Sequence, residues 1–130
     1  MHHHGVAVAD LEAMRRWYEE KLDFTVERHF TLEDARVEII KLISEGGVRV
    51  ELLKSLRTET PARVAGELVS PGEKHLCFLV DDVEEVVRAL RRREVQIVQE
   101  PKVISESNEK NCWIVDPEGN MIEFIEELEG

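Results

Sequence analysis

The chain has 130 residues, of which 42% are hydrophobic and 35% charged, and its formal net charge is −11. This profile predicts one compact soluble domain over residues 1–130 that is long enough to bury a core. The negative charge disfavours nucleic acid and anionic membranes as partners. No apolar run could span a bilayer and no secretory leader is visible, so we expect no membrane partner and a cytoplasmic location.

The first half of the sequence predicts a strand, a helix and three more strands. The first strand is expected at 5–9, and Asp10 is suited to cap the next helix, because its carboxylate can accept from free amides of the first helical turn. Apolar residues recur at helical spacing over about residues 11–22, namely Leu11, Met14, Trp17, Tyr18 and Leu22. Strands are then predicted from β-rich composition at 25–30, 36–44 and 48–54.

The second half repeats this order. A strand is expected at 75–80, Asp82 is the corresponding helix cap, and the apolar stripe of the helix runs from Val83 to Leu90. Further strands are predicted at 95–98, 111–115 and 120–125, the last two joined by the turn Asp116–Gly119. The sequence therefore predicts module 1 at 1–54, a linker at 55–73 and module 2 at 74–127.

A histidine and a glutamate recur at one spacing in both modules. Glu51 follows His3 by 48 positions, and Glu123 follows His75 by the same 48 positions. The offset of 72 that relates the two pairs also aligns Val8 with Val80, Asp10 with Asp82, Glu12 with Glu84, Arg16 with Arg88 and Gly47 with Gly119. Divalent metals accept imidazole and carboxylate ligands. The repeat therefore predicts one metal site built by two copies of one module.

The strand pattern gives these residues a common location. Each histidine lies near the start of the first strand of its module and each glutamate lies in the last strand, where alternate side chains share a face. His3 shares a face with Gly5 and Ala7, whose small size predicts room for a ligand. Four such ligands suit Ni²⁺, Co²⁺, Mn²⁺, Fe²⁺ or Zn²⁺ better than Ca²⁺.

Other interpretations of these residues remain open. Residues 1–4 could derive from a tag, and His4 competes with His3 as a ligand although its face is opposite. Glu51 could be a solvated strand residue, and His75 could have a purely structural partner. His29 is expected at the surface.

Three segments resemble the vicinal oxygen chelate superfamily: His3–Asp10, His75–Asp82 and Asp116–Phe124. This superfamily includes glyoxalase I, methylmalonyl-CoA epimerase, fosfomycin-resistance transferases, extradiol dioxygenases and bleomycin-resistance proteins. The resemblance covers essentially the whole chain and implies an α+β fold, in which two tandem βαβββ modules form a curved mixed-sheet cup. It also implies four metal ligands, in a set that looks most like that of glyoxalase I and is close to that of the epimerase: His3, Glu51, His75 and Glu123.

The resemblance implies a metal-dependent lyase or isomerase that promotes proton transfer next to a metal-polarised carbonyl, in the manner of lactoylglutathione lyase or methylmalonyl-CoA epimerase. Glu123 or Glu51 would act as the base. The partner would be a small-molecule substrate with carbonyl or vicinal oxygens, and a homodimer is expected because many relatives are dimers. Candidate anion contacts are Arg36, Lys41 and Lys54.

Two alternative functions remain open. One is a non-catalytic antibiotic-binding protein of the bleomycin-resistance type, with Trp17 or Trp113 as an aromatic contact. The other is an Fe(II) ring-cleaving dioxygenase. Within the enzyme interpretation, Ala7 and Ser55 stand where glyoxalase I usually has an arginine and an asparagine, which disfavours glutathione. Asp23 stands where the family usually has glycine, and aspartate tolerates the left-handed conformation.

Overall fold

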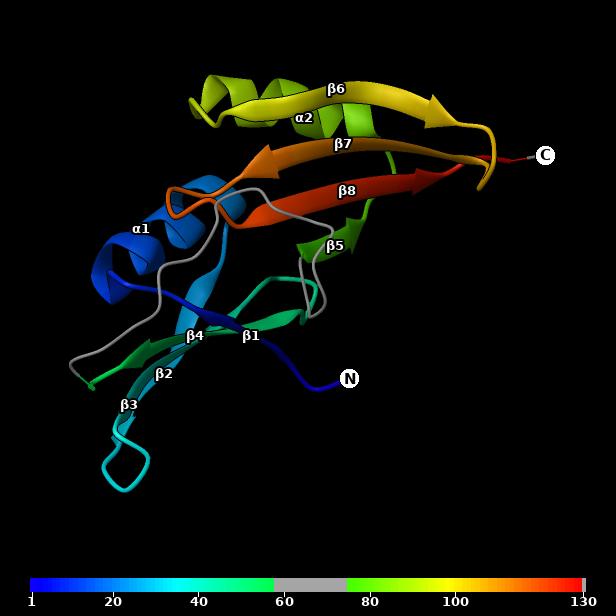
Figure 1. Cartoon of the computed structure of the whole chain (residues 1–130). Helices are drawn as coiled ribbons and strands as arrows, with labels where there is room; N and C mark the ends of the chain where they lie inside the picture. The colour runs from blue at the N-terminus through cyan, green and yellow to red at the C-terminus, as the bar shows by residue number, and fades with distance from the viewer. Residues whose placement is uncertain (58–74, 130) are drawn as a thin grey trace. The chain divides into compact units, whose positions relative to one another are not determined.

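The computed structural model describes residues 1–57 and 75–129 (Figure 1). The chain divides into two compact units, Met1–Arg63 and Val64–Gly130, and each contains one strand-helix-three-strand module. Most of the expected linker, residues 58–73, lies outside the described residues. The predicted α+β fold with two βαβββ modules is confirmed.

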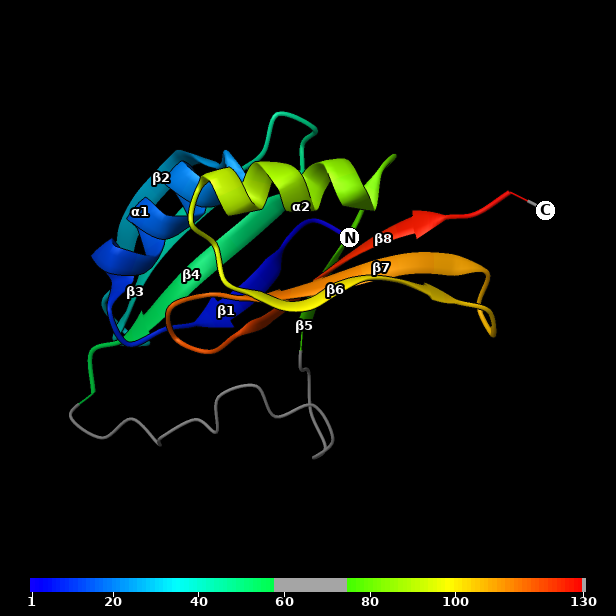
Figure 2. The ribbon, with the colours of Figure 1, turned by 90° about the horizontal axis from the view of Figure 1, so that it is seen from above.

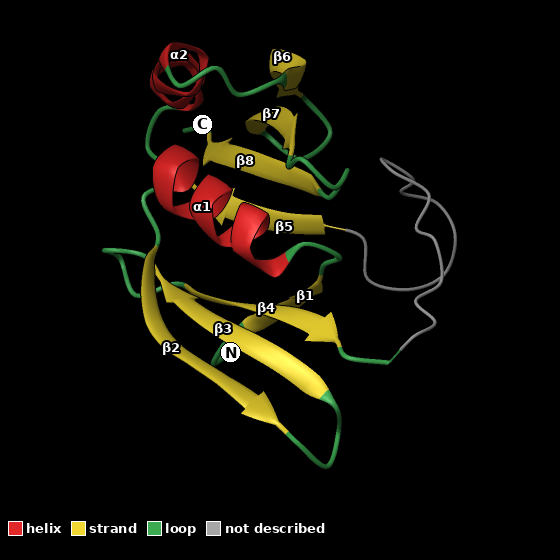
Figure 3. Cartoon of the chain, turned by 90° about the vertical axis from the view of Figure 1, so that its left-hand side faces the viewer, coloured by secondary structure: helices red, strands yellow, loops and turns green. Residues whose placement is uncertain are grey.

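The first unit is a four-stranded mixed sheet with one helix (Figure 3). Its elements are β1 (His4–Ala7), α1 (Leu11–Leu22), β2 (Thr25–Leu32), β3 (Val37–Ile43) and β4 (Arg49–Ser55). The strand order is β1-β4-β3-β2, with β1 parallel to β4 and the other neighbours antiparallel. One sheet face and the helix form the core of this unit, because the residues that face each other there are fully buried: Met14, Tyr18, Ile40, Leu42, Val50 and Leu52.

The second unit has the same topology. Its elements are β5 (His75–Leu79), α2 (Val83–Arg92), β6 (Ile97–Ile104), β7 (Glu109–Val115) and β8 (Met121–Glu127). The strand order is β5-β8-β7-β6, and again only the first strand of the module runs parallel to its neighbour. Helix α2 contacts β6, β7 and β8 and lies along one face of this sheet (Figure 2).

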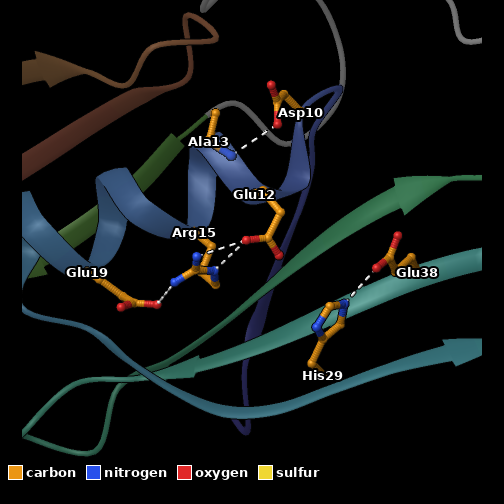
Figure 4. Close-up of polar contacts among 7 residues, drawn as sticks. All are labelled: Asp10, Glu12, Ala13, Arg15, Glu19, His29 and Glu38. Atoms are coloured by element: carbon orange, nitrogen blue, oxygen red, sulfur yellow. Dashed lines mark hydrogen bonds and ion pairs between the residues drawn. The ribbon is translucent and has the colours of Figure 1, made fainter.

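Both helices begin at the predicted caps. The Ala13 amide donates to Asp10 Oδ1 at 3.0 Å (Figure 4), and the Glu85 amide donates to Asp82 Oδ1 at 3.0 Å. These bonds satisfy amide groups that have no carbonyl partner in the first turn. Helix α1 ends at Leu22, and its C-cap Asp23 has a left-handed φ of 60°, a conformation that aspartate tolerates.

Most strand boundaries differ from the sequence prediction by one or two residues, and β6 differs the most. Strand β6 runs from Ile97 to Ile104 rather than over 95–98, and Pro101 is accommodated because β6 is an edge strand with an irregular register. Arg36 does not begin β3; it lies in the preceding turn with a φ of 54°. Neither described helix is long and apolar enough to cross a membrane.

Candidate metal centre

The parallel strand pairs place the two glutamates at equivalent positions. Gly5 pairs with Glu51 between β1 and β4, and Cys77 pairs with Glu123 between β5 and β8. His3 and His75 precede Gly5 and Cys77 by two positions, so each histidine shares a sheet face with its glutamate. We call His3 with Glu51 the first half-site and His75 with Glu123 the second half-site.

In the first half-site, His3 Nε2 lies 2.8 Å from Glu51 Oε2. Glu51 is only 6% exposed, so it is not the solvated strand residue of the alternative interpretation. His4 pairs with Val50 and therefore points to the other face, which favours His3 as the ligand. His2, which the sequence did not single out, lies with its Nδ1 2.9 Å from His3 Nδ1. One ligand atom from each of His2, His3 and Glu51 lies within 4.8 Å of the others.

In the second half-site, His75 Nε2 lies 3.4 Å from Glu123 Oε1. The other carboxylate oxygen, Oε2, accepts a hydrogen bond from Asn111 Nδ2 at 2.8 Å. Trp113 packs edge to face against His75, with ring centroids 4.7 Å apart. The carboxylate and the imidazole are therefore each held by a second side chain from β7.

Both half-sites have donor atoms that fit a divalent metal. A neutral imidazole nitrogen and a carboxylate oxygen can each donate a lone pair to one ion. Two ligand atoms that are each about 2.0–2.2 Å from an ion lie roughly 3 Å apart, and the observed separations are 2.8 and 3.4 Å. The expectation that the two half-sites form one centre stays a prediction.

Cys77 gives the second half-site a hydrogen-bond donor that the first half-site lacks. Cys77 is exposed as a residue, but partial burial of its thiol, and then its hydrogen bond to Glu123, raise the pKa of Cys77 to about 12. In the metal-free protein the thiol is therefore protonated at neutral pH and acts as a weak hydrogen-bond donor. The corresponding position in the first module is Gly5.

The candidate anion contacts have unequal positions. Lys41 pairs with Glu51 between β3 and β4, and its Nζ lies 3.9 Å from Glu51 Oε2. Lys54 is three positions from Glu51 on the same strand, so it points to the opposite face and not into the first half-site. Arg36 is exposed in the β2–β3 turn. Of these three residues, only Lys41 lies beside a half-site.

His29 is a surface residue, as predicted. Its Nε2 lies 2.6 Å from Glu38 Oε2, between β2 and β3 (Figure 4). His29 pairs with Ile40 in the ladder, one position from Lys41, so it lies on the sheet face opposite Glu51. The first unit thus carries a second histidine–glutamate pair that is separate from the half-site.

The expectation of room for a ligand above Gly5 and Ala7 stays a prediction. A Cβ atom at Gly5 would lie 3.2 Å from Leu53 Cδ1, so the leucine side chain closely approaches the glycine. Sequence reasoning also missed Asn111 and Gln99. A polar residue at the position that alternates with Trp113 was the available signal, because it places an amide on the same face as the tryptophan.

Comparison with known proteins assigns the chain to a family. The family model of the Glyoxalase/Bleomycin resistance protein/Dioxygenase superfamily matches residues 2–113. The chain belongs to this superfamily. Its members commonly use divalent metals and bind small-molecule substrates.

Two relatives are similar to this chain at modest sequence identity. Mitochondrial methylmalonyl-CoA epimerase from Bos taurus is 30% identical over 103 residues, which cover 77% of this chain and 57% of the epimerase. The chain thus spans little more than half of that enzyme. The uncharacterized protein YqjC from Bacillus subtilis (strain 168) is 28% identical over 96 residues, which cover 74% of this chain and 68% of YqjC.

Solved structures share the fold across nearly the whole chain. The glyoxalase family protein from Enterococcus faecalis has a TM-score of 0.79 at 25% identity and covers 97% of this chain and 96% of its own. Glyoxalase I from Zea mays has a TM-score of 0.75 at 20% identity, and the match covers 99% of this chain and 45% of the maize protein. At the maize identity, the likeness shows the fold alone.

Proposed function

We propose that this protein is a divalent-metal-dependent enzyme that moves a proton at the carbon next to a carbonyl group. The observation that carries the proposal is the repeated pair, with His3 2.8 Å from Glu51 and His75 3.4 Å from Glu123. Membership of the superfamily supports it, since divalent metals are common there. The donor set suits Ni²⁺, Co²⁺, Mn²⁺, Fe²⁺ or Zn²⁺.

The residues divide the chemistry between binding and proton transfer. His3, Glu51, His75 and Glu123 would hold the ion, which when bound polarises a substrate carbonyl and stabilises negative charge on its oxygen. Glu123 and Glu51 would move the proton, because carboxylates that bind the ion would lie next to the carbonyl group that the ion polarises. Two carboxylates would allow one to accept the proton and the other to return it to the opposite face of the carbon, which inverts the configuration.

For the substrate, we favour an acyl thioester of the methylmalonyl type over a glutathione adduct. Ala7 and Ser55 offer neither the cation nor the amide that the glutathione-using enzymes usually have at these positions. The 30% identity to the bovine epimerase points the same way. Lys41, whose Nζ lies 3.9 Å from Glu51 Oε2, could contact a substrate carboxylate.

Metal content of tag-free protein tests the proposal first. Mass spectrometry should find near-stoichiometric metal in the wild type and a large loss in His75→Ala and in Glu123→Ala. His29→Ala and Glu38→Ala are matched controls, because they remove a histidine–glutamate pair on the opposite face of the first sheet. Absence of metal after reconstitution with each candidate ion would overturn the proposal and favour a non-catalytic binding protein.

Solvent exchange then tests the reaction. Methylmalonyl-CoA incubated with the metal-loaded protein in D₂O should lose its α-proton signal in the proton NMR spectrum, and Glu123→Gln should slow the loss by at least about 100-fold. The hemithioacetal of methylglyoxal and glutathione serves as the competing substrate. Turnover of the hemithioacetal alone would replace the epimerase-like assignment by a lyase-like one.

A further inference from the structure

Two side-chain amides form a hydrogen-bonded chain that ends on Glu123. Gln99 Nε2 donates to Asn111 Oδ1 at 2.9 Å, and Asn111 Nδ2 donates to Glu123 Oε2 at 2.8 Å. Asn111 is only 8% exposed. We call Gln99 and Asn111 the amide relay. Because the relay is partly buried, water competes poorly for its hydrogen bonds.

The direction of the relay follows from the charge of Glu123. An ionised carboxylate can only accept hydrogen bonds, so Asn111 must turn its NH₂ group toward Glu123. The carbonyl oxygen of Asn111 then faces Gln99, which must in turn present its own NH₂ group. The two amide orientations are therefore not independent, and both are determined by the carboxylate at the end of the chain.

Three neighbouring strands build this arrangement. Trp113 pairs with Glu123 on β8 and with Gln99 on β6, so all three side chains lie on one sheet face. Asn111 lies two positions from Trp113 on the same face and contacts both of its neighbours. The register of β6 is irregular on either side of Gln99, which places this amide diagonally opposite Asn111.

We propose that Asn111 and Gln99 are positioning residues that hold Glu123 with Oε1 directed toward His75. The relay holds Oε2 by one hydrogen bond, and Oε1 lies 3.4 Å from His75 Nε2, where it can meet an ion. This inference rests on the proposed role of Glu123 as a metal ligand. Hydrogen bonds that orient ligands in this way strengthen metal binding without touching the metal.

The first half-site has no such relay among the described residues. Asn111 corresponds to Ile39 at the 72-residue offset, and the strand pairing matches Gln99, opposite Trp113, to Arg28, opposite Lys41. Ile39 has no polar side-chain atom, and Arg28 carries a guanidinium instead of an amide. Positioning by amides is therefore particular to the second module.

The decisive variant is Gln99→Glu, which changes one NH₂ group to an oxygen at constant shape. The new carboxylate can only accept, so it would draw the NH₂ group of Asn111 away from Glu123 and turn the Asn111 carbonyl toward it. Co²⁺ titrated into the full chain should bind about 10- to 100-fold more weakly, and the visible absorption of bound Co²⁺ should change. Gln99→Met and Asn111→Leu should weaken binding in the same direction.

Val98→Glu is the matched control for added charge. Val98 is 48% exposed and adjoins Gln99 in β6, so this variant adds the same charge to the same strand. The affinity of the Val98→Glu variant for Co²⁺ should equal that of the wild type. Far-UV circular dichroism establishes that each variant is folded. Wild-type Co²⁺ affinity and an unchanged spectrum in Gln99→Glu and Gln99→Met would overturn the positioning role.

Side-chain NMR of the metal-free protein separates this inference from the proposed function. If Glu123→Gln shifts the amide resonances of both Asn111 and Gln99, the relay exists in solution; unmoved resonances would overturn it. Failure of the wild type to bind Co²⁺, with the relay resonances shifting as expected, would instead overturn the metal function and with it the need to position a ligand.

Discussion

The two modules have the same backbone plan, but their glutamates lie in different surroundings. Glu51 pairs with Gly5 and Lys41, whereas Glu123 pairs with Cys77 and Trp113. A bare backbone and a cation flank the first carboxylate, and a thiol and an indole flank the second. The register that presents each carboxylate is the same in both modules, while the neighbouring side chains differ. Equivalent positions can therefore serve unequal roles, with Lys41 suited to bind an anion and β7 suited to orient Glu123.

The edge strands β2 and β6 also differ between the two modules in the exposure of their residues. Nearly every residue of β2 is exposed, whereas exposed and half-buried residues largely alternate along β6. A half-buried amide such as Gln99 can hold a fixed hydrogen bond, because fewer water molecules compete for it. The exposed edge of the first module carries Glu27 and Arg28 instead, which suit a solvated surface.

The core should show where the two modules are alike. Leu42 and Ile114 correspond at the 72-residue offset and both have 0% exposure. Each alanine variant should lower the free energy of unfolding by about 2–5 kcal/mol, because it removes packed methyl groups and leaves a cavity. Urea denaturation measures the loss, and Val98→Ala is the exposed control. A loss below about 1 kcal/mol at either position would show that its module is loosely packed.

The thiol of Cys77 should reveal the environment of Glu123. Its pKa of about 12 means that less thiolate exists at any given pH than in the unfolded chain. In metal-free protein at pH 8, Ellman's reagent should react with Cys77 at least about tenfold more slowly than with the denatured protein. The rate should keep rising up to pH 10, and Glu123→Gln should increase it. Cys77→Ser identifies the signal, and a plateau below pH 9 would contradict the raised pKa.

The helix caps should have similar effects in the two modules, apart from one additional contact. Asp10→Ala and Asp82→Ala should each lower the free energy of unfolding by about 1 kcal/mol, because each leaves an amide of the first turn unpaired. In the second module, the Val83 amide also donates to Glu126 Oε2 at 3.0 Å. Glu126→Ala should therefore lower the stability by about another 0.5–1 kcal/mol. The counterpart variant Lys54→Ala should not lower the stability in this way, because a lysine side chain cannot accept a hydrogen bond from a helix amide. Equal losses of stability in Glu126→Ala and Lys54→Ala would contradict this difference.

The smallest expected effect concerns the left-handed residues after each helix. Asp23 has a φ of 60° and Glu94 has a φ of 59°. Glu94→Gly should raise the free energy of unfolding by about 0.5–1 kcal/mol, because glycine relieves the strain of a positive φ. Asp23→Gly should gain less, since aspartate tolerates this conformation better. Thermal unfolding of both variants gives the comparison, and a larger gain at Asp23 would reverse the expected order.

Much of this protein could be predicted from its sequence, because the features concerned depend on local interactions. Asp10 and Asp82 predicted both helix starts, because an N-cap needs a short acceptor side chain directly before an apolar stripe. The helix of the first module has the expected bounds, Leu11–Leu22. The 72-residue offset predicted which histidine meets which glutamate, since a repeated module repeats its register. These features depend on residues that are close in sequence or are related by the duplication.

Only the tertiary structure decided which side chains surround each glutamate. Asn111 reaches Glu123 diagonally across β7 and β8, and Gln99 reaches Asn111 through an irregular register that no spacing in the sequence signals. Leu53 closely approaches Gly5 for a similar reason, because the approach of two strands depends on their pairing. The sequence by itself determined the modules and the histidine–glutamate pairs. Strand pairing decided the rest, because a shift of one residue would exchange every side chain between the two faces of a sheet.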